Sequence, residues 1–363
     1  MIIHDLDAAV ADLHPPVAVD TEFHAEHRYR PKLLLIQLCD ARGQTRVVDP
    51  SEHEDLTALG AALSDLPLLI HAPLQDLPLL ARTADLRPGP VTDPQVLAGF
   101  CGLGYPRALG DLVREVLGKE LPAGMSLTNW SRRPLTPEQL SYAVADVEHL
   151  HELTSALLAR IAPALRPLAM EACQELASQS LTLPDPERAW RSIAAARILD
   201  ATGRDLLRRL AAWRELSARE LNQPVRQVAS DAALIDLSRR RPTTVEAMAS
   251  NRKFPRRLVK HHSDLLLEFI AQAQPASDGW PDDHAGRVRL AAINAWLEAW
   301  AIAQELNQGI AARLALPAEA RQELALSWYR GLPNPLSGWR SQMIPAMSRL
   351  VIGSHSIEIP DKS

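Results

Sequence analysis

Short apolar runs and helical spacings alternate along the first 160 residues of this 363-residue chain. Four apolar runs bounded by turn-forming residues predict β-strands over 16–23, 32–40, 45–50 and 67–72. Apolar positions at helical spacing predict helices over 55–63, 93–101, 109–117 and 137–161. Strands and helices that follow one another in this order indicate an α/β layer fold with a mixed sheet.

The pattern changes from about residue 165 onward. The strand-like runs end, and Leu, Ala, Arg and Glu recur at helical spacing to beyond residue 330, which predicts an all-α second half. Connectors that contain proline, at 180–190 and 273–283, interrupt the helical pattern. We therefore expect an α/β domain over 1–170 and two all-α helical modules over 204–274 and 284–350.

The composition excludes several classes of protein. Hydrophobic residues make up 47% and charged residues 23%, as in globular proteins and unlike disordered chains or fibres. Cys39, Cys101 and Cys173 lack the paired spacing of a disulfide framework or a zinc site, which fits a reducing cytosol. The acidic N-terminus is not a secretory signal, and no run of 18 apolar residues follows. We expect a cytoplasmic protein with no membrane partner.

Charge divides the chain more sharply than its formal net value of −5 indicates. Residues 1–160 carry 13 basic and 22 acidic side chains, whereas residues 204–274 carry 14 basic and 8 acidic ones. An acidic module, with a net charge of −9, is therefore joined to a basic one with a net charge of +6.

Asp20 and Glu22 stand two residues apart in a predicted strand that is otherwise apolar. Side chains at that spacing leave the same face of a sheet. Two carboxylates on one face of a mostly buried strand repel each other and lose hydration, so a divalent cation would stabilise them. The alternative is that one carboxylate caps a turn and the other is solvated at the end of the strand.

Asp76 is a third candidate acid. The predicted strand over 67–72 ends at His71, and Pro73 favours the start of a helix, which places Asp76 in a first helical turn. An acid at that position complements the helix dipole, and this structural role explains Asp76 better when the segment is taken by itself.

A tyrosine and a fourth acid share the predicted helix over 137–161. Thr136 suits the N-cap of this helix, and Pro137 suits its first position. Tyr142 and Asp146 are four residues apart and therefore lie on one helical face. The alternative is an ordinary tyrosine–aspartate pair at the surface.

The order of these signals is more specific than any one of them: two acids on the first strand, an acid after a middle strand, and Tyr-x-x-x-Asp on a closing helix. In this order the chain resembles the DEDD superfamily of 3′→5′ exonucleases in its tyrosine-bearing branch, and within that branch the ribonuclease D family. The resemblance extends through nearly all of the first domain, over residues 20–38, 71–77, 92–102, 109–118 and 129–150.

The resemblance implies a ribonuclease-H-like fold in which Asp20, Glu22, Asp76 and Asp146 hold two divalent cations. Asp20 would bridge the cations, Glu22 and Asp146 would bind the one beside the nucleophile, and Asp76 would bind the second, partly through water. Tyr142 would orient the attacking water. The chemistry of phosphodiester hydrolysis also favours two cations, because they stabilise the attacking and leaving oxygens. Oxygen-only ligands favour Mg²⁺ or Mn²⁺.

Substrate binding must use cations, local basic residues and the rest of the chain, because the acidic domain disfavours a polyanion. Candidates are Arg132 and Arg133 beside the last motif, with His71 and Phe23. Each arginine could equally be a solvated surface charge. Phe23 and Trp130 could stack on a terminal base or belong to the core, which for Trp130 is the better explanation.

One loop departs from the pattern of the family. Relatives carry a lysine and acidic or polar residues ahead of the tryptophan, whereas this chain has Ala123, Gly124 and Met125 there, and Asn129 where aspartate is usual. No metal ligand is lost, so the change concerns the grip on the substrate or the position of the loop.

Residues 205–250 and 254–273 resemble an HRDC domain, a helical module associated with nucleic acids. Basic side chains give this region a candidate surface for a phosphate backbone. They are Arg239, Arg240, Arg241, Arg252, Lys253, Arg256, Arg257 and Lys260, of which Arg240 and Arg241 are the predicted contacts. The alternative is a packing module with a solvated basic surface. Residues 284–350 resemble a diverged second copy.

We therefore expect a metal-dependent 3′→5′ exoribonuclease that acts as a monomer on single-stranded 3′ ends and releases nucleoside 5′-monophosphates. The resemblance points to tRNA precursors as substrates. A catalytically weak RNA-binding scaffold is one alternative, although the complete set of carboxylates and the tyrosine argues against it. A DNA-directed 3′→5′ exonuclease is the other, since RNA is distinguished through 2′-hydroxyl contacts that the sequence does not reveal.

Overall fold

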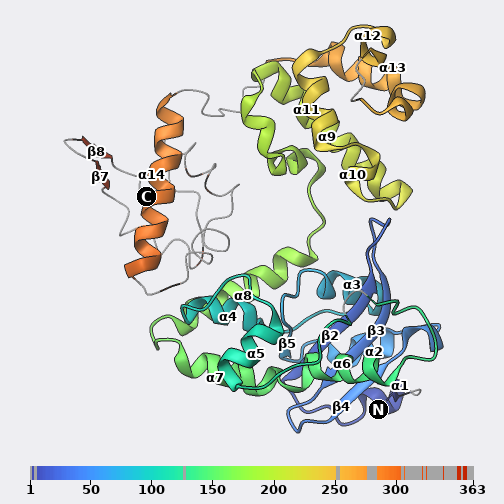
Figure 1. Ribbon diagram of the computed structural model, residues 1–363, viewed down its shortest axis with the longest axis vertical. Coiled ribbons are helices and arrows are strands. Elements are labelled where there is room, and N and C mark those ends of the chain that lie inside the picture. The colour runs from blue at the N-terminus through green and yellow to red at the C-terminus, as the bar shows by residue number, and fades with distance from the viewer. Residues whose placement is uncertain are drawn as a thin grey trace.

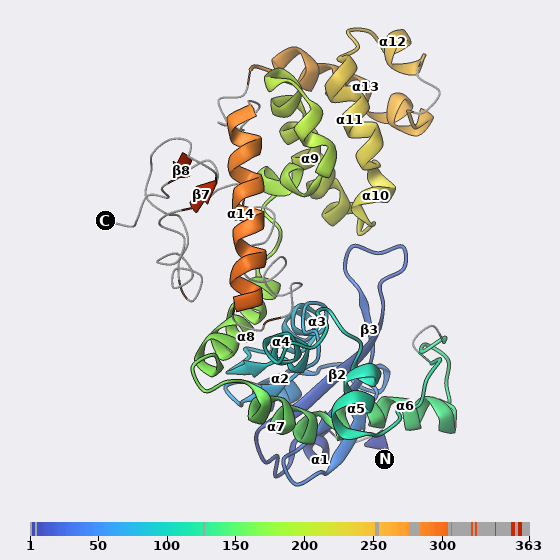
Figure 2. The same ribbon diagram turned by 60° about the vertical axis from the view of Figure 1, so that its left-hand side comes forward.

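The computed structural model describes residues 2–3, 6–125, 128–250, 254–275, 284–303, 306, 321, 324, 338, 350–352 and 355–357. An α/β body occupies one end of the molecule, and α8 (Arg166–Leu181) leads from it toward a helical body at the other end (Figure 1). The hairpin between the second and third strands projects from the α/β body toward the helical one (Figure 2). The order of the two bodies follows the order of the chain.

The α/β body is built on a six-stranded sheet with the strand order β1-β4-β3-β2-β5-β6. β3 pairs antiparallel with both β2 and β4, and the other neighbouring strands are parallel. This confirms the predicted mixed sheet. The strands are β1 (Ile2–Ile3), β2 (Val17–His24), β3 (Lys32–Cys39), β4 (Thr45–Val48), β5 (Leu68–Leu69) and β6 (Val91–Thr92). β5 falls within the apolar run predicted over 67–72, whereas the sequence did not predict β1 or β6, whose two residues belong to no such run.

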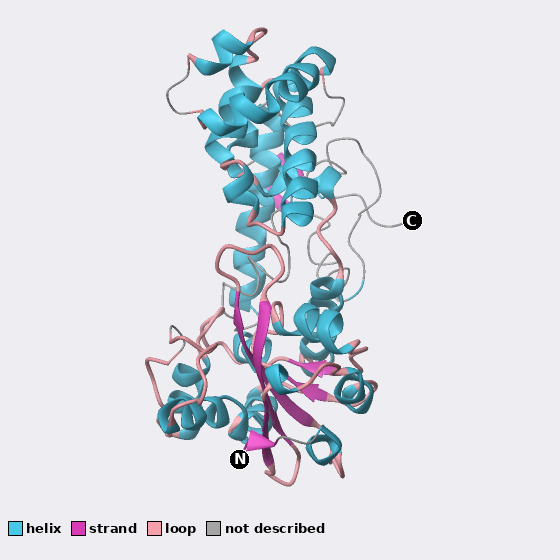
Figure 3. Ribbon diagram, turned by 90° about the vertical axis from the view of Figure 1, so that its right-hand side faces the viewer, coloured by secondary structure: helices cyan, strands magenta, loops and turns pink. Residues whose placement is uncertain are grey.

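Helices cover both faces of the sheet (Figure 3). Val17 and Val19 of β2 pack on one face with Leu59 of α2 and Leu80 of α3. On the other face, residues of β2 and β3 pack against α6 and α7. The helices of this body are α1 (Leu6–Val10), α2 (Thr57–Leu63), α3 (Asp76–Ala84), α4 (Pro94–Phe100), α5 (Leu109–Leu117), α6 (Pro137–Glu148), α7 (Leu150–Arg160) and α8 (Arg166–Leu181). A single turn of 3₁₀-helix, η1 (Pro50–Glu52), follows β4.

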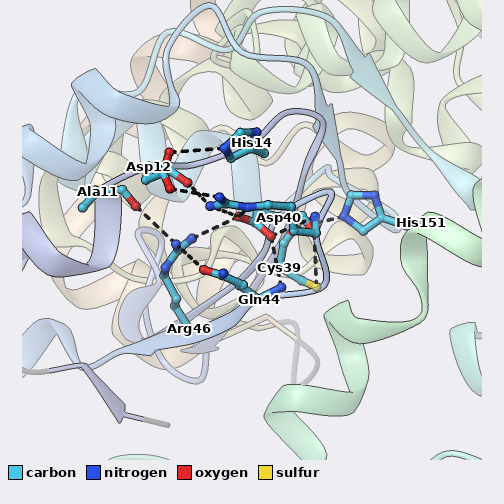
Figure 4. Close-up of polar contacts among 9 residues, drawn as sticks. Ala11, Asp12, His14, Cys39, Asp40, Gln44, Arg46 and His151 are labelled. Atoms are coloured by element: carbon cyan, nitrogen blue, oxygen red, sulfur yellow. Dashed lines mark hydrogen bonds and ion pairs between the residues drawn. The ribbon is translucent and has the colours of Figure 1, made fainter.

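The helix predicted over 137–161 is two helices in the structure. The break falls at His149, whose φ of −98° and ψ of −4° end α6 and precede α7. His151 of α7 then lies with Nε2 3.1 Å from the carbonyl oxygen of Cys39, at the end of β3 (Figure 4). Beside it, Asp40 accepts hydrogen bonds from the backbone N–H groups of Arg42 and Gln44. These contacts fix the end of β3 against the layer of α6 and α7.

The helical body is held together by a core of its own. Trp190 and Ile193 pack there with Leu206, Leu210 and other apolar residues of α9, α11, α12 and α13. Its elements are η2 (Pro186–Ser192), η3 (Ala194–Ile198), α9 (Ala201–Leu221), α10 (Val225–Val228), α11 (Asp231–Arg240), α12 (Val245–Ala249) and α13 (Arg256–Gln272). The predicted connector over 180–190 is therefore the end of α8 followed by a 3₁₀-helix.

Most of the second helical module predicted over 284–350 lies outside the described residues. Its one described helix, α14 (His284–Ala303), contributes Ile293 and Leu297 to the core that α4, α7 and α8 also form. The structure adds an antiparallel pair that the sequence did not predict, β7 (Leu350–Ile352) and β8 (His355–Ile357). None of the described helices combines the length and the apolar character needed to cross a membrane.

Candidate active site

β2 positions the first two acids. Asp20 and Glu22 alternate along this strand with Thr21, which is buried. β2 pairs with β5 only at Val17 and Ala18, so the two acids lie beyond the end of β5. Their side chains leave the sheet on the face that α6 covers, because Ala18 of the same alternation packs with Val147 of α6.

A sharp turn after β5 brings the third acid to β2. Ala72 takes a positive φ of 57°, and its N–H donates to Oδ1 of Asp93 at 3.1 Å. The chain then enters α3, which begins at Asp76 and not near Pro73, so Asp76 lies in the first turn of the helix as predicted. The hydroxyl of Thr21 donates to Oδ1 of Asp76, and both side chains are buried. This hydrogen bond fixes Asp76 beside the strand that carries Asp20 and Glu22.

α6 supplies the tyrosine and the fourth acid. The helix begins as predicted, with Thr136 at the N-cap and Pro137 at the first position. The hydroxyl of Thr136 accepts from the N–H of Gln139 at 3.2 Å, and the side chain of Gln139 accepts from the N–H of Thr136 at 3.0 Å. This capping box fixes the helix start, and therefore the direction in which Tyr142 and Asp146 project.

The structure brings the predicted acids together from distant parts of the chain. Carboxylate oxygens of Asp20, Glu22 and Asp146 lie within 4.8 Å of one another. Asp76 is not part of this group of three, but its charge acts on Asp20 and Glu22. Oxygen-only donors at this spacing fit a hard divalent cation such as Mg²⁺ or Mn²⁺.

The pKa values of the clustered acids are raised, so a positive charge among them would stabilise their ionised forms. Burial, followed by the repulsion of Asp76, Asp146 and Glu22, raises the pKa of Asp20 well above its usual range. Burial and the charges of Asp146 and Asp76 raise the pKa of Glu22 to about 8. Burial alone raises the pKa of Asp146 to about 7, and it is the main cause that raises the pKa of Asp76 to about 6. A cation among these acids would favour the ionised forms that the crowding disfavours.

Tyr142 is on the same helix as Asp146, and its ring packs against Trp130. The two ring centroids are 6.0 Å apart, and Trp130 is 1% exposed in a core with Leu35 and Val47. Trp130 is thus a core residue that supports Tyr142. Burial, followed by the charges of Asp146, Glu22 and Asp20, raises the pKa of the Tyr142 phenol further above neutrality. The phenol therefore keeps its proton and can donate a hydrogen bond.

Comparisons with known proteins agree with this geometry. A family model described as 3′-5′ exonuclease matches residues 3–162, and an HRDC domain model matches residues 203–270. Ribonuclease D of Pseudomonas paraeruginosa is 31% identical over 338 residues, which cover 90% of this chain and 89% of that protein. The chain belongs to the ribonuclease D family. It is thereby a 3′→5′ exoribonuclease.

Solved structures support the membership. The chain is similar to the crystal structure of Escherichia coli RNase D, with a TM-score of 0.80 at 27% identity over 96% of both chains. That protein is described as an exoribonuclease involved in structured RNA processing. The catalytic core of RRP6 from Trypanosoma brucei shares the fold, with a TM-score of 0.54 at 19% identity over 74% of this chain and 78% of that one.

Two of the substrate contacts predicted near the ribonuclease D motifs have partners inside the protein. His71 lies with Nε2 3.1 Å from the carbonyl oxygen of Arg107, and burial lowers its pKa to about 4, so the ring is neutral. The guanidinium of Arg133 contacts Asp49 and donates to the carbonyl oxygens of Trp130 and Leu34. Both side chains therefore connect separate segments of the α/β body.

The other two predicted contacts in this domain remain accessible. Arg132 is exposed, and Phe23 is half-buried against the core of the sheet. The altered loop is anchored, since Met125 packs beside Trp130, and Asn129 accepts from the N–H of Ser131 at 3.0 Å. Residues 126–127 of this loop lie outside the described residues.

The predicted arginines of the HRDC domain are engaged in ion pairs. Arg240 pairs with Asp236 one helical turn earlier, and Arg241 binds Asp200 with its Nη1 2.7 Å from Oδ1. Arg239 is exposed and forms no hydrogen bond or ion pair with another described residue. Arg252 and Lys253 lie outside the described residues.

The contact between the β2–β3 hairpin and the HRDC domain was not predicted from the sequence. The hydroxyl of Tyr29 donates to Oε1 of Glu215 at 2.5 Å and accepts from Nε of Arg219 at 3.0 Å. The backbone N–H of Arg30 donates to the side chain of Asn222 at 2.9 Å. These partners are about 190 positions apart, and no periodicity connects them. A single sequence carries no signal for such a pairing.

Proposed function

We propose that this ribonuclease D family member hydrolyses RNA from single-stranded 3′ ends, tRNA precursors among them, with the help of two Mg²⁺ or Mn²⁺ ions. Asp20, Glu22, Asp76 and Asp146 would hold these cations. The observation that carries the proposal is the approach of the Asp20, Glu22 and Asp146 oxygens to within 4.8 Å of one another. When bound, the cations stabilise negative charge on the attacking and leaving oxygens of the phosphodiester.

The residues of the chain place the reactants. The protonated phenol of Tyr142 donates a hydrogen bond that orients the attacking water beside Glu22 and Asp146. Water attacks phosphorus, and the bond from phosphorus to the 3′-oxygen of the preceding nucleotide breaks. The last nucleotide leaves as a 5′-monophosphate, and the shortened strand keeps a 3′-hydroxyl. The acidic cluster lies between the sheet and α6. A site in that position suits a single-stranded 3′ end, because it cannot reach bonds inside a duplex.

We also propose that the chain works as a cytoplasmic monomer with an exonuclease domain over 1–170 and helical modules over 204–274 and 284–350. Separate hydrophobic cores in the α/β and helical bodies support the first division. Three free cysteines support a reducing compartment.

Digestion of 3′-extended tRNA precursors, and of an RNA and a DNA strand of the same sequence, tests the function. We expect stepwise shortening of RNA from the 3′ end with Mg²⁺ or Mn²⁺, and none in a chelator. Asp20→Asn should abolish turnover, with an unchanged circular dichroism spectrum as the control for folding. Inactivity of the wild type with both ions would favour a binding scaffold, and equal rates on DNA would defeat the RNA assignment.

A further inference from the structure

Gln37 is a buried polar residue in the middle of β3. Its side chain is 0% exposed. Neither Nε2 nor Oε1 of its amide has a hydrogen-bond partner among the described residues. A buried amide without partners destabilises a protein, because its polar groups lose their hydrogen bonds to water and gain none in return. Such a group therefore needs a reason to be there.

The sheet register places Gln37 directly opposite Asp20. The two residues are partners in the antiparallel pairing of β2 and β3. Opposite residues of an antiparallel pair project from the same face, with Cβ atoms about 4.5–5.5 Å apart. Gln37 therefore shares the face of the sheet from which Asp20 reaches the acidic cluster.

The neighbours of Gln37 along β3 and opposite it in β4 are apolar, while Glu22 of β2 lies diagonally from it on the same face. Leu35 and Cys39, two residues to either side in β3, pack against α6 and α7. Val47 faces Gln37 from β4 and belongs to the same core as Leu35. Asp20 is the polar side chain directly opposite the amide, and a carboxylate is a strong acceptor for an amide N–H.

We propose that Gln37 is a positioning residue whose amide N–H donates to the Asp20 carboxylate, directly or through one water, when a divalent cation is bound. This inference rests on the proposed metal-binding role of Asp20. A neutral amide orients the carboxylate without adding charge, so it leaves the full negative charge of Asp20 for the cation. Partners of this kind orient metal ligands in many sites, and their loss weakens metal binding about 10–100-fold.

Gln37→Met in the full-length chain tests the proposal, because methionine fills a similar volume without polar N–H groups. Mn²⁺ binding is measured by electron paramagnetic resonance, and unfolding is followed in a chelator. We expect the dissociation constant for Mn²⁺ to rise about 10–100-fold, while the midpoint of metal-free unfolding stays the same or rises. A purely structural role predicts the opposite pair of results, a lower midpoint with unchanged Mn²⁺ affinity, which would overturn the proposal. Gln37→Leu provides a second apolar replacement should the methionine variant not fold.

Thr154→Val is the matched control. Thr154 of α7 is 6% exposed, and its hydroxyl also has no partner among the described residues, but it lies outside the acidic cluster. This variant should bind Mn²⁺ like the wild type, and equal weakening in both variants would overturn the proposal. Asp20→Asn distinguishes failure of the proposed metal-binding role of Asp20 from failure of the proposed positioning role of Gln37. If it abolishes Mn²⁺ binding while Gln37→Met does not weaken it, the role of Gln37 alone fails. If the wild type binds no Mn²⁺, both fail.

Discussion

Asp20 occupies the most crowded position among the four acids, because Asp76, Asp146 and Glu22 all raise its pKa. Different contacts fix the side chains around it. Thr21 donates a hydrogen bond to Asp76, a capping box fixes the start of α6, and Trp130 packs against Tyr142. The chemistry at the residue scale therefore depends on neighbours outside the group of four acids.

Tyr142→Phe tests the role of the phenol. The ring and its packing on Trp130 remain, and only the proposed hydrogen bond to the attacking water is lost. We expect kcat to fall by roughly 10²-fold with KM little changed, since one donor at the reacting oxygens contributes about that much. Single-turnover digestion of RNA measures this, and Mn²⁺ affinity equal to that of the wild type is the control. An unchanged kcat would exclude the assigned role.

At the scale of elements, the β2–β3 hairpin links the acidic cluster to the HRDC domain. Its base carries Asp20 and Glu22, and its far end reaches α9, where Tyr29 meets Glu215 and Arg219 (Figure 2). One continuous pair of strands thus carries both the candidate metal ligands and the contact between the two bodies.

Tyr29→Phe should loosen this contact while it keeps the ring beneath Arg219, whose guanidinium lies 5.9 Å from the ring centroid. A hydrogen bond to a charged group contributes roughly 1.5–3 kcal/mol. We therefore expect amide hydrogen exchange over residues 24–32 to speed up about tenfold or more, measured by mass spectrometry. Exchange in β4, away from the contact, is the control. Unchanged exchange in the hairpin would show that the hydroxyl does not hold it.

The elements differ in how well the sequence predicts them. β2, β3 and β4 and the start of α6 were predictable, because their apolar runs and the Thr136–Pro137 cap are local signals. The break at His149 was not, since the apolar pattern continues through it. The set of four acids could be assembled only through the resemblance. The partners of Arg133 and the strand register that places Gln37 opposite Asp20 depend on tertiary packing, which leaves no period in the sequence.

At the scale of the whole molecule, an acidic exonuclease domain is joined to a basic HRDC domain. We therefore expect a polyanion to be bound by the proposed cations of the first domain and by exposed basic side chains of the second. Figure 3 shows the two bodies at opposite ends, with the hairpin between them. An RNA strand that touches both would have its 3′ end held in the cluster while its body lies on the helices.

Substitutions within the consecutive arginines 239–241 test whether exposed basic side chains of the HRDC domain bind RNA. Arg239 is exposed and forms no ion pair with another described residue, whereas Arg241 binds Asp200, the N-cap of α9. Arg239→Gln should weaken RNA binding and reduce the slope of log affinity against log salt by about 0.7. Arg241→Gln, the matched control, should lower the unfolding midpoint with little change in that slope. Equal slopes in Arg239→Gln and the wild type would place RNA binding elsewhere.

The most direct test of the account is anomalous diffraction from crystals soaked in Mn²⁺. We predict two peaks about 3.5–4 Å apart, bounded by the carboxylates of Asp20, Glu22, Asp76 and Asp146. No peak among these four side chains, or Mn²⁺ bound only elsewhere on the protein, would contradict the metal-dependent mechanism.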